Sequence, residues 1–440
     1  MDQNIDNSAA VRWRPLSPAQ LPIWRAEVLR RQTPRWTQTT IIRLTGMVDP
    51  DALEQAIETV LARHPALRTR LQRRAGQALQ TFPAPEPFAL ARHDRPTAEG
   101  SDAAAIEAFL LTSRHDRFEL YGGALFRADL LVLAQQRFVL ILRLHHIAAD
   151  GVALGMIVPQ IAAAYRGEAG NREPDHGYER WLDRQEMTGP SGLDAAAAHY
   201  RHELDGARLH SDALYDRPDD AVRREPPDLA EATRTLGAST CDGLRTLARA
   251  QGATLFIVLF AAYAATLRSF AQQDDLVIAT FASGRVGEPA PVIGSCINTL
   301  LVRVRLSTQE AAAALIEAVK EAWRPVRRHQ TVPMALLSCA DGTALPLAQY
   351  AINFLDMNET SFEAPGISST VTHAQQGFPL NDVLLYALRE QDGRLRLRLI
   401  AGSGTPRLSQ SRLNDMLDAL VRRIDDWTTM PRQTDRLPPA

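Results

Sequence analysis

A buried strand, a histidine-containing loop and a helix follow one another without interruption between residues 138 and 165. Residues 138–144 are an almost continuous apolar run, and residues 145–151 read His-His-Ile-Ala-Ala-Asp-Gly. Apolar residues then recur at helical spacing from Val152 to Tyr165. Such a segment places an imidazole at the end of a buried strand, where a base is rigidly held and still reachable from a cleft.

The residue types in this loop suit acyl transfer, which needs a proton acceptor for the nucleophile and stabilisation of an oxyanion. Histidine titrates near neutrality. Because neighbouring side chains on an extended segment point in opposite directions, one of His145 and His146 is expected to face the cleft and the other to pack behind it. Asp150 is interpreted as a structural acid at the start of the helix. Gly151 is interpreted as permitting a tight turn or a close approach of the backbone.

Composition excludes several other classes of protein. The 440 residues are 45% hydrophobic and 23% charged, which is typical of a globular protein of two or three domains. A formal net charge of −2 implies no nucleic-acid partner. Cys241, Cys296 and Cys339 form no CxxC pair, which argues against a zinc site or a disulfide framework. With no signal peptide and no apolar run of about 20 residues, the sequence predicts a cytoplasmic protein without a membrane or metal partner.

Strand and helix patterns occur in two similar parts of the chain. We expect an N-terminal half over residues 1–185, a connector rich in Pro, Asp, Arg and Ala over 186–233, and a C-terminal half over 234–440. Two such halves predict a cleft between them, where small-molecule chemistry usually takes place. The expected strands include residues 39–44, 125–133, 138–144, 276–281, 302–306, 350–355, 383–388 and 394–400, and the expected helices include 152–165, 195–204, 239–250 and 409–427.

Residues 145–151 resemble the HHxxxDG signature of the condensation-domain superfamily. This superfamily contains the condensation domains of nonribosomal peptide synthetases, related carrier- or CoA-dependent acyltransferases and, more distantly, chloramphenicol acetyltransferase. Two segments depart from the motifs of the superfamily. In residues 293–300, Cys296 stands where the motif usually has Phe, and residues 400–405 match a later motif poorly. Five further segments resemble motifs of the superfamily in the same order along the chain, namely residues 16–24, 63–69, 178–181, 293–300 and 329–333.

The resemblance implies an α/β (α+β) fold of two chloramphenicol-acetyltransferase-like halves, with mixed sheets flanked by helices in a V-shaped arrangement around a central cleft or tunnel. It also implies roles for individual residues. His146 corresponds to the base or substrate-positioning group, and His145 is mainly structural. Asp150 is expected to form a salt bridge with Arg285, which follows a glycine after the strand 276–281. Asn298, Ser17 and Trp24 are candidates for the substrate channel.

The implied activity is that of a free-standing, monomeric condensation enzyme of natural-product biosynthesis. It takes an acyl or peptidyl group from a phosphopantetheine thioester on a carrier protein and forms an amide or ester with an amine or hydroxyl acceptor. No cofactor is expected to be bound, and no adenylation or carrier-attachment motif occurs in the sequence. The basic residues between Arg324 and Arg328 are interpreted as a solvated helix face, with contact to an acidic carrier protein as the alternative.

Three other activities remain open at this point. An acyl-CoA-dependent O- or N-acyltransferase would use the same chemistry with a different donor, and an epimerase would use the same histidine motif. A non-catalytic module that recruits partners is the third, although the intact His145, His146, Asp150 and Gly151 argue against it. Heterocyclisation is disfavoured, because relatives with that activity replace the histidines by aspartates.

Overall fold

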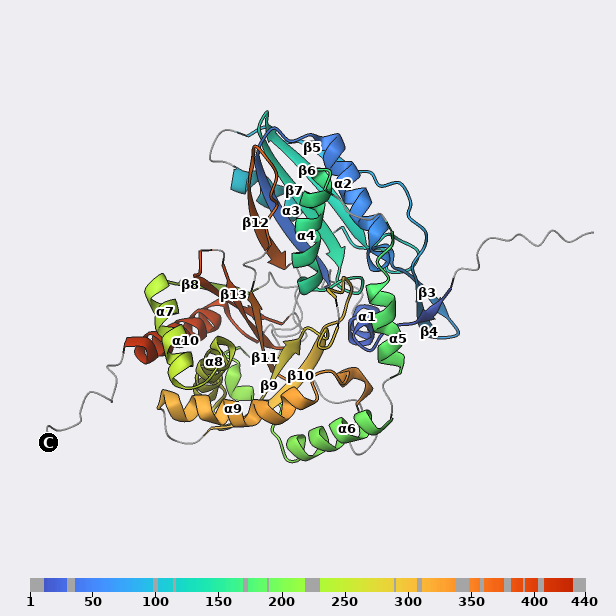
Figure 1. The fold of residues 1–440 in the computed structure, drawn as a ribbon. Coiled ribbons are helices and arrows are strands. Elements are labelled where there is room, and N and C mark those ends of the chain that lie inside the picture. The colour runs from blue at the N-terminus through green and yellow to red at the C-terminus, as the bar shows by residue number, and fades with distance from the viewer. Residues whose placement is uncertain are drawn as a thin grey trace, which may run out of the picture. The chain divides into compact units, whose positions relative to one another are not determined.

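The computed structural model divides the chain into two compact units (Figure 1). Unit 1 comprises Met1–Thr188, Ser283–Ile297 and Thr360–Gly377, and unit 2 comprises Gly189–Ala282, Asn298–Glu359 and Phe378–Ala440. The residues that the structure describes are 12–29, 36–97, 102–113, 116–168, 173–187, 190–217, 230–288, 290–306, 311–337, 348–356, 360–375, 381–390, 392–402 and 407–429.

A five-stranded sheet organises unit 1, with the strand order β12-β2-β7-β6-β5. Strand β7 lies at its centre and pairs antiparallel with β2 and β6, while β5 pairs parallel with β6. Nearly every residue of β7 is buried, which explains its continuous apolar run, because both faces of this strand are covered. The strands are β2 (Thr37–Gly46), β5 (Ala91–Asp94), β6 (Phe126–Ala134), β7 (Arg137–His145) and β12 (Ile367–Gln375).

Helices cover both faces of this sheet. The even-numbered residues Leu140, Leu142 and Leu144 of β7 pack in one core with α2 (Pro50–Arg63) and α4 (Gly151–Tyr165). The odd-numbered Val139 and Ile141 pack in a second core with α3 (Asp102–Ser113). This alternation follows from the two-residue period of a strand. Unit 1 also contains α1 (Gln20–Leu29), α5 (Gly177–Glu186), η1 (Pro65–Arg68) and a small sheet of β1 (Arg14–Pro15), β4 (Gln77–Thr81) and β3 (Arg70–Arg74).

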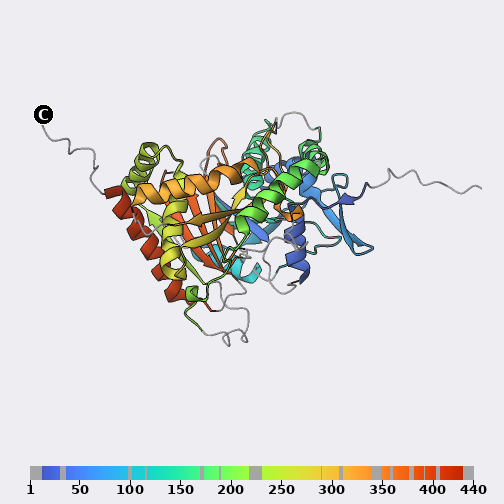
Figure 2. The same cartoon turned by 90° about the horizontal axis from the view of Figure 1, so that it is seen from below.

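Unit 2 is built on a six-stranded mixed sheet with the order β10-β9-β11-β13-β14-β8. The helices α7 to α10 pack on one face, and α6 packs on the other through Ala196 and Tyr200 (Figure 2). The strands are β8 (Glu231–Leu236), β9 (Asp275–Ala282), β10 (Asn298–Arg305), β11 (Tyr350–Asp356), β13 (Val383–Arg389) and β14 (Leu395–Ala401). The helices are α6 (Pro190–Leu204), α7 (Ala238–Ala250), α8 (Leu255–Ala271), α9 (Ala312–Arg328) and α10 (Gln410–Thr429), with η2 (Asp212–Leu214) and η4 (Met334–Leu336).

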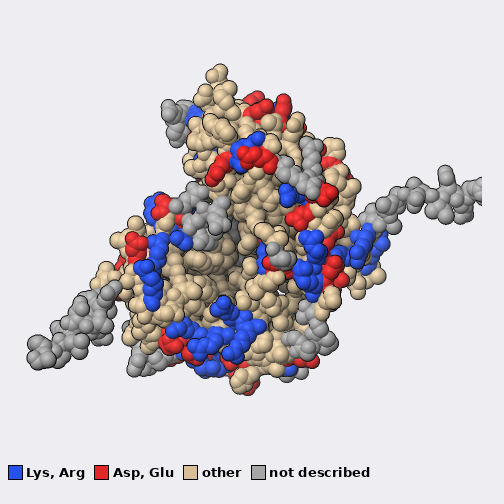
Figure 3. Space-filling model, viewed as in Figure 1, with Lys and Arg blue, Asp and Glu red and all other residues tan. Residues whose placement is uncertain are grey.

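Basic side chains gather over α9 (Figure 3). Arg324 pairs with Glu321 at 3.0 Å within the helix. Arg327 and Arg328 are exposed and have no ion-pair partner among the residues that the structure describes. These two arginines therefore present unneutralised charge at the C-terminal end of the helix.

The mixed sheets flanked by helices confirm the predicted α/β class, but the two units differ from the predicted contiguous halves. Residues 283–297 and 360–377 lie in the C-terminal part of the sequence and nevertheless belong to unit 1. The reason for the second segment is β12, which pairs along β2 from Ile367 to Gln375. Part of the expected connector 186–233 is α6, which is longer than the expected 195–204 helix and packs on unit 2. Connector residues 188–189 and 218–229 lie outside the described residues.

Within the described part of the chain, no single helix is both long and apolar enough to cross a bilayer. Helices α7 and α8 pass such a test only when counted together, across a bend of 102°. Residues of both helices contribute to the main core of unit 2. Burial in that core accounts for the apolar character of the pair.

Candidate active site

His145 is the last residue of β7 and packs inside unit 1. Its side chain is buried, with the residue 4% exposed, and its ring meets Phe118 edge-to-face at 6.0 Å between centroids. The Nδ1 atom accepts a hydrogen bond of 3.1 Å from the backbone N–H of Ile147. Burial, with a smaller contribution from His146, lowers the pKa of His145 to about 3. This ring is therefore neutral at pH 7 and holds the loop in shape.

His146 is only half-buried, and its ring makes no hydrogen bond to the described residues. Its backbone N–H donates to the carbonyl of Trp36 at 2.7 Å, and its imidazole meets the Trp36 indole edge-to-face at 5.8 Å. Burial lowers the pKa of His146, although the negative charge of Asp150 acts in the opposite direction. The result is a neutral imidazole, fixed by its backbone and one aromatic neighbour, whose Nδ1 is buried without a partner.

The loop after His146 is anchored by the first helix of the chain. Gln20, fully buried at the start of α1, donates from Nε2 to the carbonyl of Ile147 at 2.9 Å and to Gln80 Oε1 at 2.9 Å. Ser17 and Gln20 also bond reciprocally, since the Ser17 N–H donates to Gln20 Oε1 at 2.8 Å and the Gln20 N–H donates to Ser17 Oγ at 3.2 Å. This is the arrangement of a capping box. Ser17, a candidate for the substrate channel, thus has an anchoring role at the helix start.

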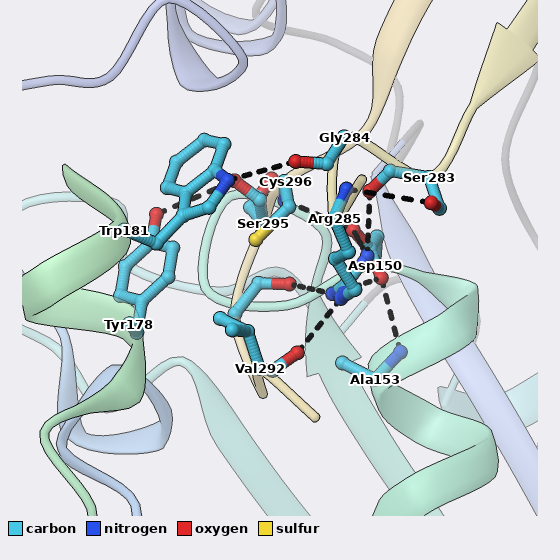
Figure 4. A network of polar contacts seen from close by, with 11 residues as sticks. Asp150, Ala153, Tyr178, Trp181, Ser283, Gly284, Arg285, Val292, Ser295 and Cys296 are labelled. Atoms are coloured by element: carbon cyan, nitrogen blue, oxygen red, sulfur yellow. Dashed lines mark hydrogen bonds and ion pairs between the residues drawn. The ribbon is translucent and has the colours of Figure 1, made fainter. Parts of the chain in front are cut away.

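Asp150 and Arg285 form a bidentate ion pair at the start of α4 (Figure 4). Two guanidinium–carboxylate bonds of 2.9 Å join them, and Asp150 is fully buried while the Arg285 side chain is 10% exposed. The carboxylate also accepts from the backbone N–H of Ala153 at 3.0 Å, which caps α4, and from that of Cys296 at 2.9 Å. One carboxylate therefore joins α4 to the segment 283–297.

All five N–H donors of Arg285 are occupied. Besides the two bonds to Asp150, the guanidinium donates to the backbone carbonyls of Val292 at 2.8 Å, Ser283 at 2.9 Å and Gly294 at 2.9 Å. Burial alone lowers the pKa of Arg285, but the adjacent Asp150 carboxylate reverses the effect and the pKa is raised. Such a saturated, buried pair fixes backbone geometry and has no donor left for a substrate.

Two glycines allow the segment 283–297 to pack this tightly. Gly284 has φ +66°, and a Cβ there would lie 1.8 Å from the carbonyl oxygen of Cys296. A Cβ on Gly294 would lie 2.1 Å from the ring of Tyr178 on α5. Tyr178 stacks on Trp181, whose indole N–H donates to the Gly284 carbonyl at 2.8 Å (Figure 4). The motif at residues 178–181 and residues 293–297 of a second motif thus meet in unit 1.

The remaining candidate residues occupy other positions. Gly151 is the first residue of α4, has no left-handed φ, and would place a Cβ within 4 Å of no described atom, so the described fold itself does not require a glycine there. Trp24 on α1 donates from its indole to Tyr121 Oη at 2.8 Å. Asn298 lies in unit 2, where its amide bonds the backbone of Gln330, Val332 and Met334 at 2.7–3.0 Å. Those bonds join the loop after α9 to β10 and occupy the Asn298 amide, and the channel role of Asn298 stays a prediction.

Sequence reasoning missed two residues beside His146. Trp36 supplies both the carbonyl and the ring that fix His146, and Gln38 is buried in the same region of β2. The sequence does contain a signal, because residues 37–40 read Thr-Gln-Thr-Thr directly before the apolar pair Ile41-Ile42 of the same strand. No group of three or more His, Cys, Asp or Glu side chains suited to a metal ion occurs in the described parts of the chain.

The chain belongs to the condensation-domain family, whose model matches residues 12–434. Condensation domains are in general acyl or peptidyl transferases of nonribosomal peptide and related natural-product synthesis. A linear gramicidin synthase of Brevibacillus parabrevis is 31% identical over 333 residues, which cover 73% of this chain and 4% of that protein. Chondramide synthase cmdD of Chondromyces crocatus is 28% identical over 399 residues, which cover 87% of this chain and 10% of that protein. The chain thus spans a small part of the curated relatives it matches.

Solved structures share the fold. The condensation domain of the monacolin K polyketide synthase MokA superposes with a TM-score of 0.80 at 18% identity, covering 96% of this chain and 98% of that one. The starter condensation domain of rhizomide synthetase RzmA, solved with C8-CoA, gives 0.79 at 20% identity over 97% of each chain. The X-domain in complex with OxyB from teicoplanin biosynthesis gives 0.74 at 23% identity, covering 94% and 93%. These likenesses bear out the predicted chloramphenicol-acetyltransferase-like fold.

Proposed function

We propose that this chain transfers an acyl or peptidyl group from a phosphopantetheine thioester on a carrier protein to an amine or hydroxyl acceptor, with His146 as the base. The proposal rests on the protonation, position and hydrogen bonding of His146. Its imidazole is neutral because burial lowers its pKa, its position is fixed by Trp36, and its ring forms no side-chain hydrogen bond to the described residues. A general base needs this combination of a free lone pair and a fixed position.

The transfer proceeds by addition and elimination at the thioester carbonyl. The acceptor nitrogen or oxygen attacks the carbonyl carbon while His146 takes its proton. The tetrahedral intermediate then collapses, the C–S bond breaks, and the proton passes from His146 to the pantetheine sulfur, which leaves as a thiol. Fixing the acceptor against the thioester supplies much of the rate, since effective molarities of oriented groups are large.

The remaining residues of the motif have a supporting role in this proposal. His145 shapes the loop through Ile147, and Asp150 fixes the start of α4 against Arg285. Neither side chain has the exposure that contact with a substrate requires, since both are buried. The chemistry therefore depends on one histidine, and the other positions of the motif determine where it points.

Two alternative functions differ from this proposal. One uses another acyl donor, and the other has no catalytic activity. An acyl-CoA donor carries the same pantetheine arm, and the RzmA starter domain was solved with C8-CoA. A recruitment module without transferase activity is the other, and the teicoplanin X-domain forms a complex with OxyB. The free His146 imidazole favours the transferase over the recruitment module.

Intact-mass spectrometry of acyl transfer distinguishes these functions. A panel of acyl groups is supplied on a carrier protein and on CoA, together with pooled amines and alcohols. Carrier-dependent product that is lost in His146→Ala supports the proposal and identifies the bond formed. Product from CoA alone moves the chain to the CoA-dependent acyltransferases, and inverted donor stereochemistry without transfer indicates an epimerase. Carrier binding without product across the panel favours the recruitment module.

The matched control is His64→Ala. His64 is a second buried histidine of unit 1, and its Nε2 lies 2.7 Å from Gln160 Oε1. Its ring has a partner and belongs to no reaction in this proposal. We expect transfer to survive in His64→Ala at temperatures where that variant is folded, and to fall by at least about a hundredfold in His146→Ala. Equal losses in both variants would contradict the role of His146.

A further inference from the structure

Strand β2 buries four consecutive polar residues, Thr37 to Thr40. Gln38 has the most unusual environment of the four. It is only 4% exposed, and neither its Oε1 nor its Nε2 has a hydrogen-bond partner among the described residues. An unpaired amide inside a protein is costly, and buried polar groups are paired as a rule. Gln38 therefore points to a ligand that supplies both an acceptor and a donor.

The strand register places Gln38 beside His146. Gln38 lies opposite Leu144 in the β2–β7 ladder, and the Trp36 carbonyl accepts from the N–H of His146 one step further. Gln38 and His146 are thus diagonal neighbours on one face of the sheet, within reach of long side chains. That face carries Leu142 and Leu144 of the core formed with α4.

Two further unpartnered groups lie on the same face. His373 on β12 is opposite Thr40, which makes it a diagonal neighbour of Gln38 on the other side from His146. Within the described chain, the buried His373 Nε2, Trp36 Nε1 and His146 Nδ1 atoms all lack a hydrogen-bond partner. We call Trp36, Gln38 and His373 the polar stripe. Its unpartnered groups run from β12 across β2 and end beside His146, the proposed base, which follows β7.

The polar stripe is uncharged. Thr40 Oγ1 lies 2.9 Å from His373 Nδ1, and burial lowers the pKa of His373 to about 4, so this imidazole is neutral at pH 7. Arg143, which is nearby in β7, belongs to the opposite face and pairs there with Asp129 at 2.8 Å. Without a cation the stripe does not suit a carboxylate or a phosphate. An indole N–H, a carboxamide and a neutral imidazole suit an uncharged group with both a carbonyl and an N–H.

We propose that the polar stripe binds a secondary amide of the substrate and holds it beside His146, an inference that rests on the acyl transfer proposed above. The amide N–H donates to Gln38 Oε1, and its carbonyl, on the opposite side of the planar trans amide, accepts from the Trp36 indole. Gln38 Nε2 donates to a second carbonyl of the same ligand. Such an amide has two sources, the pantetheine arm itself or the acyl chain that the arm carries. Either way the stripe is a positioning and specificity site for the donor or product, adjacent to the base.

Gln38→Leu tests the proposal because it keeps the size of the side chain and removes only its polar atoms. The matched control is Gln80→Leu, which changes a fully buried glutamine whose amide is satisfied by Gln20 and by the Pro15 carbonyl. Gln80→Leu should lower the melting temperature because it breaks bonds within the fold. Gln38→Leu should leave the melting temperature unchanged or raise it, since no bond within the described chain is lost. Trp36→Phe adds a variant that keeps a ring against His146 and removes the indole N–H.

Binding is measured by isothermal titration calorimetry in a His146→Ala background, where no transfer takes place, and KM is measured with His146 present. The probes are free pantetheine, hexanoyl-pantetheine and N-acetylalanyl-pantetheine. Loss of two hydrogen bonds predicts at least about tenfold weaker binding in Gln38→Leu. An equal loss for all three probes assigns the stripe to the pantetheine amides. A loss for N-acetylalanyl-pantetheine alone assigns it to the acyl-chain amide.

The inference is overturned if Gln38→Leu changes the affinity for every probe by less than twofold. It is also overturned if Gln38→Leu lowers the melting temperature as far as Gln80→Leu does, because the amide would then have a structural role. A failure of the proposed function has a different signature, namely no transfer with His146 present. In that case, the affinities measured by calorimetry with and without Gln38→Leu still show whether the polar stripe binds the probes.

Discussion

Removal of the Asp150 carboxylate should destabilise unit 1 far more than removal of an ordinary helix cap. Asp150→Ala removes the cap of α4, the bond from the Cys296 N–H and both bonds to Arg285, and it leaves a guanidinium 10% exposed without its counter-charge. Breaking a buried ion pair by removing one partner costs about 3–5 kcal/mol. For a folding unit of this size, that corresponds to a decrease in melting temperature of roughly 6–20 °C.

Asp49→Ala is the matched control, because Asp49 caps α2 in the same way. It accepts from the N–H groups of Asp51 at 2.9 Å and Ala52 at 3.2 Å, but it is exposed and has no arginine partner in the described chain. Loss of a cap alone costs about 1 kcal/mol, or roughly 2–4 °C. The difference between the two variants isolates the contribution of the buried pair.

Differential scanning calorimetry of both variants, of Arg285→Ala and of the Asp150→Ala/Arg285→Ala double variant completes the test. Because the two side chains bond each other directly, the double variant should lose less stability than the sum of the single losses. An Asp150→Ala melting temperature no lower than that of Asp49→Ala would refute the reasoning. Additive single effects would refute it as well.

The remaining predictions concern pH dependence and docking, and the histidine and glutamine variants described above complete the set. Burial lowers the pKa of His145 to about 3, below the unfolded value of 6.5, so the unfolded chain binds more protons between these values and stability falls as the pH falls through this window. Urea titrations at pH 7 and pH 5 should show about 2 kcal/mol more loss in the wild type than in His145→Gln; equal losses would contradict the assignment. Reversing the exposed charges of α9 with Arg327→Glu and Arg328→Glu should raise KM for an acidic carrier protein severalfold, more at low salt, and leave KM for the same acyl group on CoA unchanged. A carrier-protein KM that does not change on charge reversal would show that this end of α9 is a solvated surface.

The sequence predicts the central strand and helix of unit 1 almost to the residue. The apolar run predicts a strand over 138–144, and β7 spans Arg137–His145; the helical spacing predicts 152–165, and α4 spans Gly151–Tyr165. Both have strong patterns, a doubly buried strand and a largely apolar helix, which depend only on local residues. Membership of residues 360–377 in unit 1 depends instead on pairing with a strand more than 300 positions away, which no local pattern contains.

In the candidate site, too, the sequence predicts some features and not others. Motif resemblance predicts the pairing of Asp150 with Arg285, and the structure places the two groups 2.9 Å apart. The three backbone carbonyls that also bind Arg285 depend on the path of residues 283–294 and leave no trace in the residue types. The backbone bonds of Asn298 could not be predicted for a related reason, since an amide that bonds backbone groups looks the same in sequence as one that meets a substrate. The polar stripe beside His146 could not be predicted from the sequence, because its residues come together only through the register of β2 with β7 and β12.

The most direct test of the central claim is a single-turnover measurement with a preloaded acyl carrier protein and a productive acceptor. Transfer is followed by intact mass in the wild type, His146→Ala and His64→Ala at equal folded concentration. The account predicts rapid transfer by the wild type and His64→Ala, and a rate in His146→Ala that is lower by at least about a hundredfold with carrier binding unchanged. Near-wild-type turnover by His146→Ala would contradict it.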